Sequence, residues 1–365
     1  MGCLGLLAAL PAARPSHAAA PAGLAPRVAT FSNVAVDTIE GEWGVAVASR
    51  FLAVGSVVPW ARAGVGAVAT QASANTAFGS YGLDLMERGY SASETLTRLL
   101  ATDDQPEIRQ LALVDGHGRT AVHSGEKCDG WAGAARGPGF AVIGNSLTGG
   151  DVVDSMARAF QETRGSLAER LLAALEAGDG AGGDHRGRQA AALLVVKGAG
   201  GYRGGDDRMV DLRVDDHEAP VKELERIYVL HAAYYLPAIH VRLGDENLAA
   251  GHRAEAEREY ARVVDLFGKA IKSFPQDARL MNGLAWFYVQ HRANLDEAFR
   301  WAEAARRQDP KSWEIVDTLA EIHFARGNFV QAYQHALLAL ELDPESSYLR
   351  GQVARFQDLV ERLEQ

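Results

Sequence analysis

The chain has 365 residues, of which 47% are hydrophobic and 23% are charged, so it is too apolar for a disordered protein and long enough to form two domains. Lys and Arg number 37 against 47 Asp and Glu, and the formal net charge of -10 argues against a nucleic-acid partner.

Residues 1–26 are predicted to be a leader. A short apolar run from Leu4 to Leu10 precedes small residues, and Ala18 or Ala20 fits the small-x-small rule for signal-peptide cleavage. We therefore predict an exported protein, periplasmic or extracellular. The alternative is a disordered Ala- and Pro-rich tail on a cytoplasmic protein. No other stretch approaches the roughly 18 apolar residues of a membrane span, so no transmembrane segment is predicted.

Residues 27–218 are predicted to form an α+β domain. Short alternating or β-branched runs separated by glycines indicate strands, and turns such as DGHGR at 115–119 indicate antiparallel hairpins. Such sheets need helices packed on an apolar face. The expected strands are 30–37, 42–49, 64–72, 110–115, 119–124, 140–145, 189–197 and 210–214, and the expected helices are 82–102 and 151–177.

Residues 219–365 are predicted to be all-α, with a repeat of 34 residues. The segments AFRWAEAARRQDP at 298–310 and AYQHALLALELDP at 332–344 superpose at that spacing, and a looser third copy begins near Leu236. The pattern resembles the tetratricopeptide repeat, whose small residues let two helices cross closely and whose proline ends the second helix. This resemblance implies a protein partner bound by the repeats. A dimerisation or docking array is the alternative, and a homo-oligomer stays open. The superposed positions are Ala298 with Ala332, Ala302 with Ala336, Ala305 with Ala339 and Pro310 with Pro344.

Thr30 is the first residue of a predicted strand that begins just after the leader. If the turn TIEG at 38–41 joins the strands on either side, Asp37 faces Glu42 and Thr30 faces Ser49, with Arg50 beside it. A threonine with a free α-amine is a complete catalytic unit, because its Oγ can attack a carbonyl while the amine, with a reference pKa of about 8, accepts the proton. This chemistry requires the removal of everything before Thr30.

Four segments between Ala29 and His217 carry a resemblance to a known family: ATFSNVAVDTIEGEWGVAVASRFLAVGSVVPWARAGVGAVATQA, CDGWAG, GFAVIGNSLTGGDVVDSMARAF and GGDHRGRQAAALLVV. They resemble the domain of unknown function 1028 family, which has an N-terminal-nucleophile (Ntn) hydrolase-like fold. The resemblance implies a four-layer αββα sandwich. By analogy with other Ntn hydrolases, it also implies hydrolysis of a small or peptide-like amide by an N-terminal residue, without a cofactor.

The leader makes this chain unlike many members of that family, which begin with Met-Thr-Phe-Ser, so that removal of the methionine frees the threonine. Here 29 residues precede Thr30, and a cut between Ala29 and Thr30 places Arg27 where the cleavage rule prefers a small residue. A second cut or self-processing is therefore needed if Thr30 is the nucleophile.

Further polar residues are candidates for the same site. The amide of Asn145 could donate to an oxyanion, with a turn-forming role as the alternative. Arg186, in the loop GGDHRGRQ at 182–189, could hold a substrate carboxylate, with a structural salt bridge as the alternative. Gln71 could supply another amide, or simply end a strand. The expected substrate-binding residues around the catalytic Thr30 are Ser49, Arg50, Gln71, Asn145, Asp184, Arg186 and Gln189.

No metal or nucleotide site is expected. His117, His123 and Cys128 match no standard zinc spacing, and the glycine-rich segments lack the Walker lysine. Cys3 would leave with the leader, so no intramolecular disulfide is expected. The rival to a hydrolase is a non-catalytic binding or scaffold protein that keeps the sandwich and presents the repeats to a partner.

Overall fold

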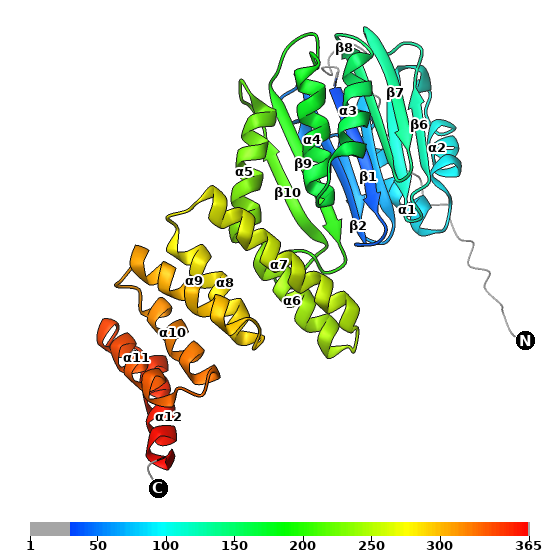
Figure 1. Cartoon of the computed structure of the whole chain (residues 1–365). Coiled ribbons are helices and arrows are strands. Elements are labelled where there is room, and N and C mark those ends of the chain that lie inside the picture. The colour runs from blue at the N-terminus through cyan, green and yellow to red at the C-terminus, as the bar shows by residue number, and fades with distance from the viewer. Residues whose placement is uncertain (1–29, 364–365) are drawn as a thin grey trace, which may run out of the picture.

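The computed structural model describes residues 30–363 and consists of a β-sandwich with helices on both sides, followed by an array of helices (Figure 1). The predicted leader and its cleavage sites lie outside the described residues. The predicted fold class, α+β followed by all-α, is confirmed. The strands are β1 (Thr30–Asp37), β2 (Glu42–Ser49), β3 (Pro59–Arg62), β4 (Gly66–Ala72), β5 (Arg109–Asp115), β6 (Thr120–Ser124), β7 (Trp131–Gly137), β8 (Phe140–Leu147), β9 (Ala190–Lys197) and β10 (Arg208–Val214).

The strands form two antiparallel sheets. One sheet has six strands in the order β10-β9-β2-β1-β8-β7, and the other has four in the order β3-β4-β5-β6. The register of β1 on β2 pairs Thr30 with Ser49 and Asp37 with Glu42, as the TIEG turn predicts. Because side chains alternate between the faces of a strand, this register sends Thr30 and Ser49 to the same face of the six-stranded sheet.

The sandwich has four layers, each held to the next by an apolar core. Helices α3 (Asp151–Glu162) and α4 (Leu167–Gly180) cover the six-stranded sheet, and α1 (Ala77–Glu87) and α2 (Ala92–Leu100) cover the four-stranded sheet. Between the sheets lies a core rich in valine and alanine, to which alternate residues of β1 and β2 contribute. The αββα arrangement expected from the family resemblance is therefore present.

Four predictions for the sandwich are wrong in detail. The expected helix at 82–102 is two helices, because Gly89 takes a φ of +94° between α1 and α2. The expected helix at 151–177 is also two, separated by Gly165 with a φ of +133°. The expected strand at 64–72 begins only at Gly66, after the separate strand β3, and β7 was not predicted at all.

The C-terminal half is a stack of helix pairs, as predicted. The second helices of two successive pairs bury the repeated alanines: Ala298, Ala302 and Ala305 in one, and their 34-residue equivalents in the next, are all 0% exposed. These small side chains let the paired helices approach closely, as in tetratricopeptide repeats. The helices are α5 (Pro220–Tyr234), α6 (Leu236–Ala249), α7 (Arg253–Ser273), α8 (Ala278–Gln290), α9 (Leu295–Gln308), α10 (Trp313–Ala325), α11 (Phe329–Leu342) and α12 (Ser347–Leu363).

The array begins as part of the sandwich core. Leu224 of α5 and Leu243 of α6 belong to the same buried cluster as Leu193 of β9 and Leu171 of α4. Figure 1 shows α6 and α7 beneath one end of the six-stranded sheet, with the later helices extending away from it. Over residues 30–363, no helix combines the length and the apolar character needed to cross a membrane.

Candidate functional site

Thr30 begins β1 and is fully buried. Its Oγ donates a hydrogen bond to Ser49 Oγ over 3.2 Å, and both side chains lie on the face of the sheet that meets the second sheet. The two hydroxyls at the ends of β1 and β2 are therefore brought together by the strand register.

Amide side chains from the second sheet meet Thr30 at this end of the sandwich. The Nε2 of Gln71, in β4, donates to the carbonyl oxygen of Thr30 over 3.1 Å. The Oε1 of Gln71 accepts a hydrogen bond of 2.7 Å from Ser32, which lies two residues further along β1. The structure thus places Gln71, a predicted site residue, next to Thr30.

Gln110 of β5, which was not predicted, connects the remaining amides. Its Oε1 accepts hydrogen bonds from Gln71 Nε2 at 2.8 Å and from Asn145 Nδ2 at 2.9 Å. Its own Nε2 donates to the carbonyl oxygen of Gly144 over 2.8 Å. Gln110 alternates with Ala112 and Val114 on the strand face buried between the sheets. A polar residue on an otherwise apolar strand face was the signal that could have revealed it.

The backbone is strained beside two of these amides. Ala72, directly after Gln71, has a φ of +65°, and Ser146, directly after Asn145, has a φ of +52°. Residues other than glycine seldom adopt this left-handed conformation, and such strain clusters at functional sites.

The 182–189 loop closes the outer side of β2. Asp184 accepts a hydrogen bond from the backbone N–H of Arg50 over 3.0 Å and pairs with the guanidinium of Arg186 at 2.7 Å. The arginine expected to hold a substrate carboxylate is thus held by a carboxylate of the protein, which favours the salt-bridge alternative for Arg186.

A small cavity of about 90 Å³ lies between this loop, Ser49 and the C-terminal end of α4. Arg188 lines it and pairs with Asp179 at 2.6 Å, and this hydrogen bond raises the pKa of Arg188. The side chain of Gln189 instead points to the outer edge, where its Nε2 donates to Asp216 over 3.1 Å. Of the predicted residues, Thr30, Ser49, Gln71 and Asn145 form one connected group, and Asp184, Arg186, Arg50 and Gln189 surround its outer side.

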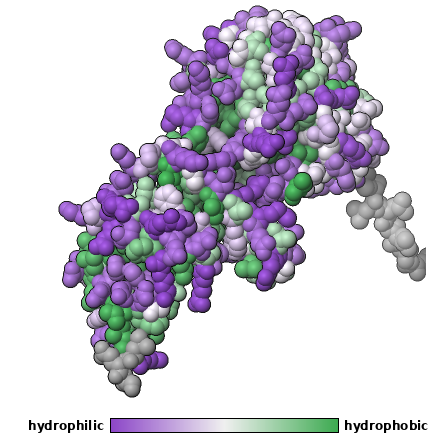
Figure 2. Space-filling model, in the orientation of Figure 1, coloured by the Kyte–Doolittle hydropathy of each residue, from purple (hydrophilic) through white to green (hydrophobic). Residues whose placement is uncertain are grey.

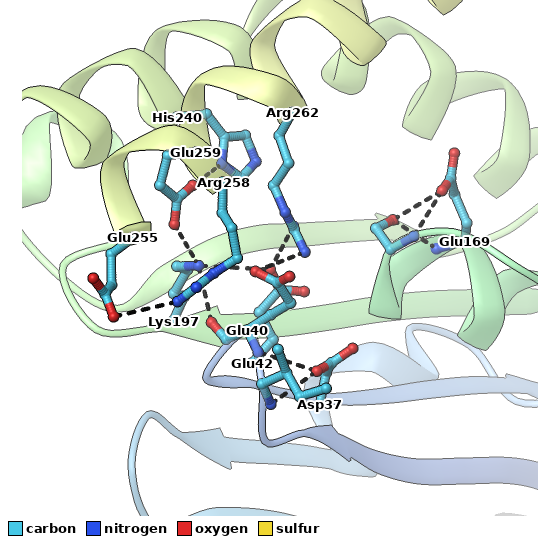
Figure 3. Close-up of polar contacts among 12 residues, drawn as sticks. Asp37, Glu40, Glu42, Glu169, Lys197, His240, Glu255, Arg258, Glu259 and Arg262 are labelled. Carbon is cyan, nitrogen blue, oxygen red and sulfur yellow. Dashed lines mark hydrogen bonds and ion pairs between the residues drawn. The ribbon is translucent and has the colours of Figure 1, made fainter. Parts of the chain in front are cut away.

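A second polar cluster joins the opposite end of the β1–β2 hairpin to the helical array (Figure 3). We call it the seam cluster. Glu42 is 0% exposed and accepts a hydrogen bond of 2.8 Å from Arg262 of α7. Arg262 also pairs with Glu40 in the hairpin turn at 3.0 Å. The seam cluster consists of Glu40, Glu42, Lys197, His240, Glu259 and Arg262.

Two carboxyl groups of the seam cluster have opposite pKa shifts. Burial raises the pKa of Glu42, although Arg262 and Lys197 act against it. Burial also opposes ionisation of Glu259, but the hydrogen bond from His240 and the charge of Lys197 outweigh it and lower the pKa to about 2. Lys197 lies 2.7 Å from Glu259, and His240 Nδ1 lies 2.5 Å from the other carboxylate oxygen. No local sequence pattern pointed to this cluster, because Glu42 and Arg262 are 220 residues apart.

His117, His123 and Cys128 form no common site. His123 Nε2 bonds the carbonyl oxygen of Pro106 over 2.8 Å. Across residues 30–363, no group of three or more His, Cys, Asp or Glu residues is arranged to hold a metal ion.

Similar solved structures are known for both parts of the chain. No curated protein matches the chain. Among solved structures, a DUF1028 protein from Silicibacter pomeroyi is 30% identical with a TM-score of 0.51, over 56% of this chain and 89% of that one. A thermophilic TPR protein from Thermus thermophilus is 22% identical with a TM-score of 0.32, over 38% of this chain and 72% of that one.

The family model described as "Family of unknown function (DUF1028)" matches residues 30–224, more than half of the chain. The match begins at Thr30 itself and ends inside α5. The chain therefore belongs to the DUF1028 family, and it joins a domain of that family to a tetratricopeptide-like helical array.

Proposed function

We propose that the chain is an N-terminal-nucleophile hydrolase of a small or peptide-like amide, with Thr30 as both nucleophile and base. One observation carries the proposal: Thr30, the first residue of β1, has its hydroxyl 3.2 Å from Ser49 Oγ and its carbonyl oxygen bonded to Gln71, within a buried group of polar side chains. Most buried positions between two sheets are apolar, so a polar group concentrated around one strand end is a candidate site.

In the proposed reaction, the α-amine of Thr30 takes the hydroxyl proton while Oγ forms a bond to the substrate carbonyl carbon. The amide C–N bond then breaks, and the proton passes to the leaving nitrogen. Water, deprotonated by the same amine, hydrolyses the resulting ester and restores the hydroxyl. No cofactor takes part. The side-chain amide of Asn145 belongs to the same polar group and has two N–H hydrogens, one of which donates a hydrogen bond to Gln110. In this proposal the amide stabilises the oxyanion by donating a hydrogen bond to it.

The proposal requires Thr30 to become the N-terminal residue. Export would remove part of the leader, and a second cut would free the amine. Because Thr30 is 0% exposed, substrate access also requires a change at this end of the sandwich. The proposal therefore requires both processing of the chain and access to Thr30.

The intact mass of the mature protein tests the first requirement, since it must correspond to a chain that begins at Thr30. The second test is hydrolysis of a panel of small and peptide-like amides by the processed protein, by Thr30→Ala and by Thr30→Ser. We expect Thr30→Ala to lose activity, Thr30→Ser to keep part of it, and both to unfold at nearly the wild-type urea concentration. Hydrolysis that survives in Thr30→Ala would overturn the assignment.

The second candidate function is non-catalytic binding, with the array as the partner surface. The full burial of Thr30 favours it, and so does the apolar surface visible on the array in Figure 2. Val330 and Leu337 of α11 are exposed apolar residues of the array. A mature chain that begins at Ala19 or Pro21, with Thr30 still in a peptide bond, would support this function instead.

A further inference from the structure

The ends of three strands form a charged depression beside the candidate site. In the six-stranded sheet β9 lies between β2 and β10, so the residues that follow β2 and β10 flank the start of β9. The depression has a volume of about 550 Å³. It is lined by Arg50, Arg188, Gln189, Asp216, His217 and Glu218.

Gln189 forms the centre of the depression. Its backbone N–H donates to the carbonyl oxygen of Ser49 over 3.2 Å, and its carbonyl oxygen accepts from the N–H of His217 over 2.8 Å. These backbone bonds fix the ends of the three strands relative to one another. The depression is therefore built on the sheet rather than on a loose loop.

Opposite charges lie on the two sides of Gln189. Arg50 follows β2 on one side, and Asp216 and Glu218 follow β10 on the other. Since neighbouring strands are about 4.8 Å apart, the two sides are separated by roughly 10 Å. The second cation, Arg188, is already neutralised by Asp179 at 2.6 Å.

Arg50 is the cation that is available to a ligand. Its backbone N–H is held by Asp184 at 3.0 Å, which fixes the start of its side chain. Within residues 30–363, its guanidinium makes no hydrogen bond or ion pair, and the residue is exposed. A guanidinium in this position can bind a carboxylate through two parallel hydrogen bonds.

We propose that the depression binds a short peptide with free ends, its carboxylate on Arg50 and its ammonium group near Asp216 and Glu218. A free amino acid is too short to reach both sides, whereas two or three extended residues span about 7 to 10 Å. The inference rests on the proposed function in one respect, because it names the substrate class of the Thr30 site. Since Arg50 directly follows Ser49, the carboxyl end of the peptide lies nearer to Thr30.

Calorimetric titration of the Thr30→Ala protein tests binding without hydrolysis. The probes are trialanine, trialanine amide and N-acetyltrialanine. We expect trialanine to bind. The C-terminal amide and the N-terminal acetyl group should each weaken binding about tenfold or more, because each cap removes a hydrogen-bonded charge from one end of the peptide. Equal affinity for the capped and free peptides, or no binding of trialanine at millimolar concentration, would overturn the inference.

Variants then assign each end of the peptide. Arg50→Gln should abolish the difference between trialanine and its amide but keep the effect of the acetyl cap. The double variant Asp216→Asn/Glu218→Gln should abolish the effect of the acetyl cap but keep the difference between trialanine and its amide. Arg208→Gln, at the opposite end of β10, is the matched control and should bind like the parent protein. An unchanged preference for the free carboxylate in Arg50→Gln would refute the assignment of Arg50.

The two proposals fail separately. If trialanine binds with this charge dependence and the processed wild-type protein cleaves no peptide, the hydrolase assignment fails and the binding site stands. If the processed protein cleaves neutral amides as readily as free peptides, the peptide site fails and the hydrolase assignment stands.

Discussion

Replacing Arg262 by methionine should strongly destabilise the protein, because Arg262 is the principal partner of a buried carboxylate. Glu42 is 0% exposed, its Oε1 lies 2.8 Å from Arg262, and its Oε2 has no hydrogen-bond partner among the described residues. Without Arg262, the nearest remaining cation is Lys197, which lies 3.9 Å from Oε1. Methionine keeps much of the side-chain volume and removes the charge.

The expected loss in the free energy of unfolding follows from leaving the charge of Glu42 buried without its partner. Removing one member of a buried ion pair typically costs about 3 to 5 kcal/mol. The side chain of Arg262 is 22% exposed, so water screens part of the interaction and the lower figure, about 3 kcal/mol, applies. With a urea dependence of about 3 kcal/mol per molar, the unfolding midpoint should fall by about 1 M.

Urea unfolding followed by circular dichroism measures the effect, and the double variant Arg262→Met/Glu42→Gln provides the control. The double variant removes the buried charge of Glu42 and leaves without Arg262 only Glu40, whose side chain is 19% exposed, so its stability should return to within about 1 kcal/mol of wild type. The loss in Arg262→Met should also shrink as the pH falls. Burial raises the pKa of Glu42 in the folded protein, so protonation favours the folded state. A loss below about 1 kcal/mol, or no recovery in the double variant, would refute this reasoning.

Three further predictions concern stability. Glu259→Gln should weaken the dependence of stability on pH in the acid range. In the folded protein the pKa of Glu259 is about 2, below the ordinary 4.5, so the stability that ionised Glu259 contributes is present above pH 4.5 and is lost as the pH falls towards 2. Urea midpoints measured across this pH range will test this. Asn33→Val should raise the free energy of unfolding by about 1 kcal/mol, because both polar atoms of this buried amide lack partners among the described residues, and a lower urea midpoint would contradict it. Gly79→Ala should lower the melting temperature, since the new Cβ would lie 2.1 Å from the Trp60 ring, whereas Gly268→Ala inside α7 meets nothing within 4 Å and should raise stability by up to about 1 kcal/mol.

The sequence predicted the features that depend on neighbouring residues. The hairpin register followed from one turn and the two-residue period of a strand, and the helix pairs followed from alanines repeated every 34 residues. The two strands that were missed, β3 and β7, are both at sheet edges. The residues WAGAARG of β7 have little intrinsic preference for a strand, so pairing with β8 decides their conformation.

The sequence predicted only those contacts of the candidate site that join residues near one another in the chain or paired by one hairpin. The pairing of Thr30 with Ser49 is local to one hairpin, whereas the link from Gln71 to Gln110 and Asn145 depends on packing one sheet against the other. The pairing of Arg186 with Asp184 is local too, and the sequence left it open as an alternative. No local sequence pattern predicts the contact between Glu42 in the sandwich and Arg262 in the helical array.

The positions of the two polar groups limit what the helical array can do to the proposed reaction. Glu42 and Thr30 lie at opposite ends of the β1–β2 hairpin, whose strands each have 8 residues, so the seam cluster is roughly 25 Å from the nucleophile. The start of α5 lies near the Thr30 end of the sheet, where Pro220 lines the small cavity beside Ser49, but α6 and the later helices lie at the seam end and extend away from it (Figure 1). A partner bound along α8 to α12 would lie further away still, so a short peptide in the depression beside Arg50 could not reach it. The proposed hydrolysis and the proposed partner binding are thus separable in this geometry, and substitutions on the exposed face of α11 should change binding of a partner without changing any hydrolysis that depends on Thr30.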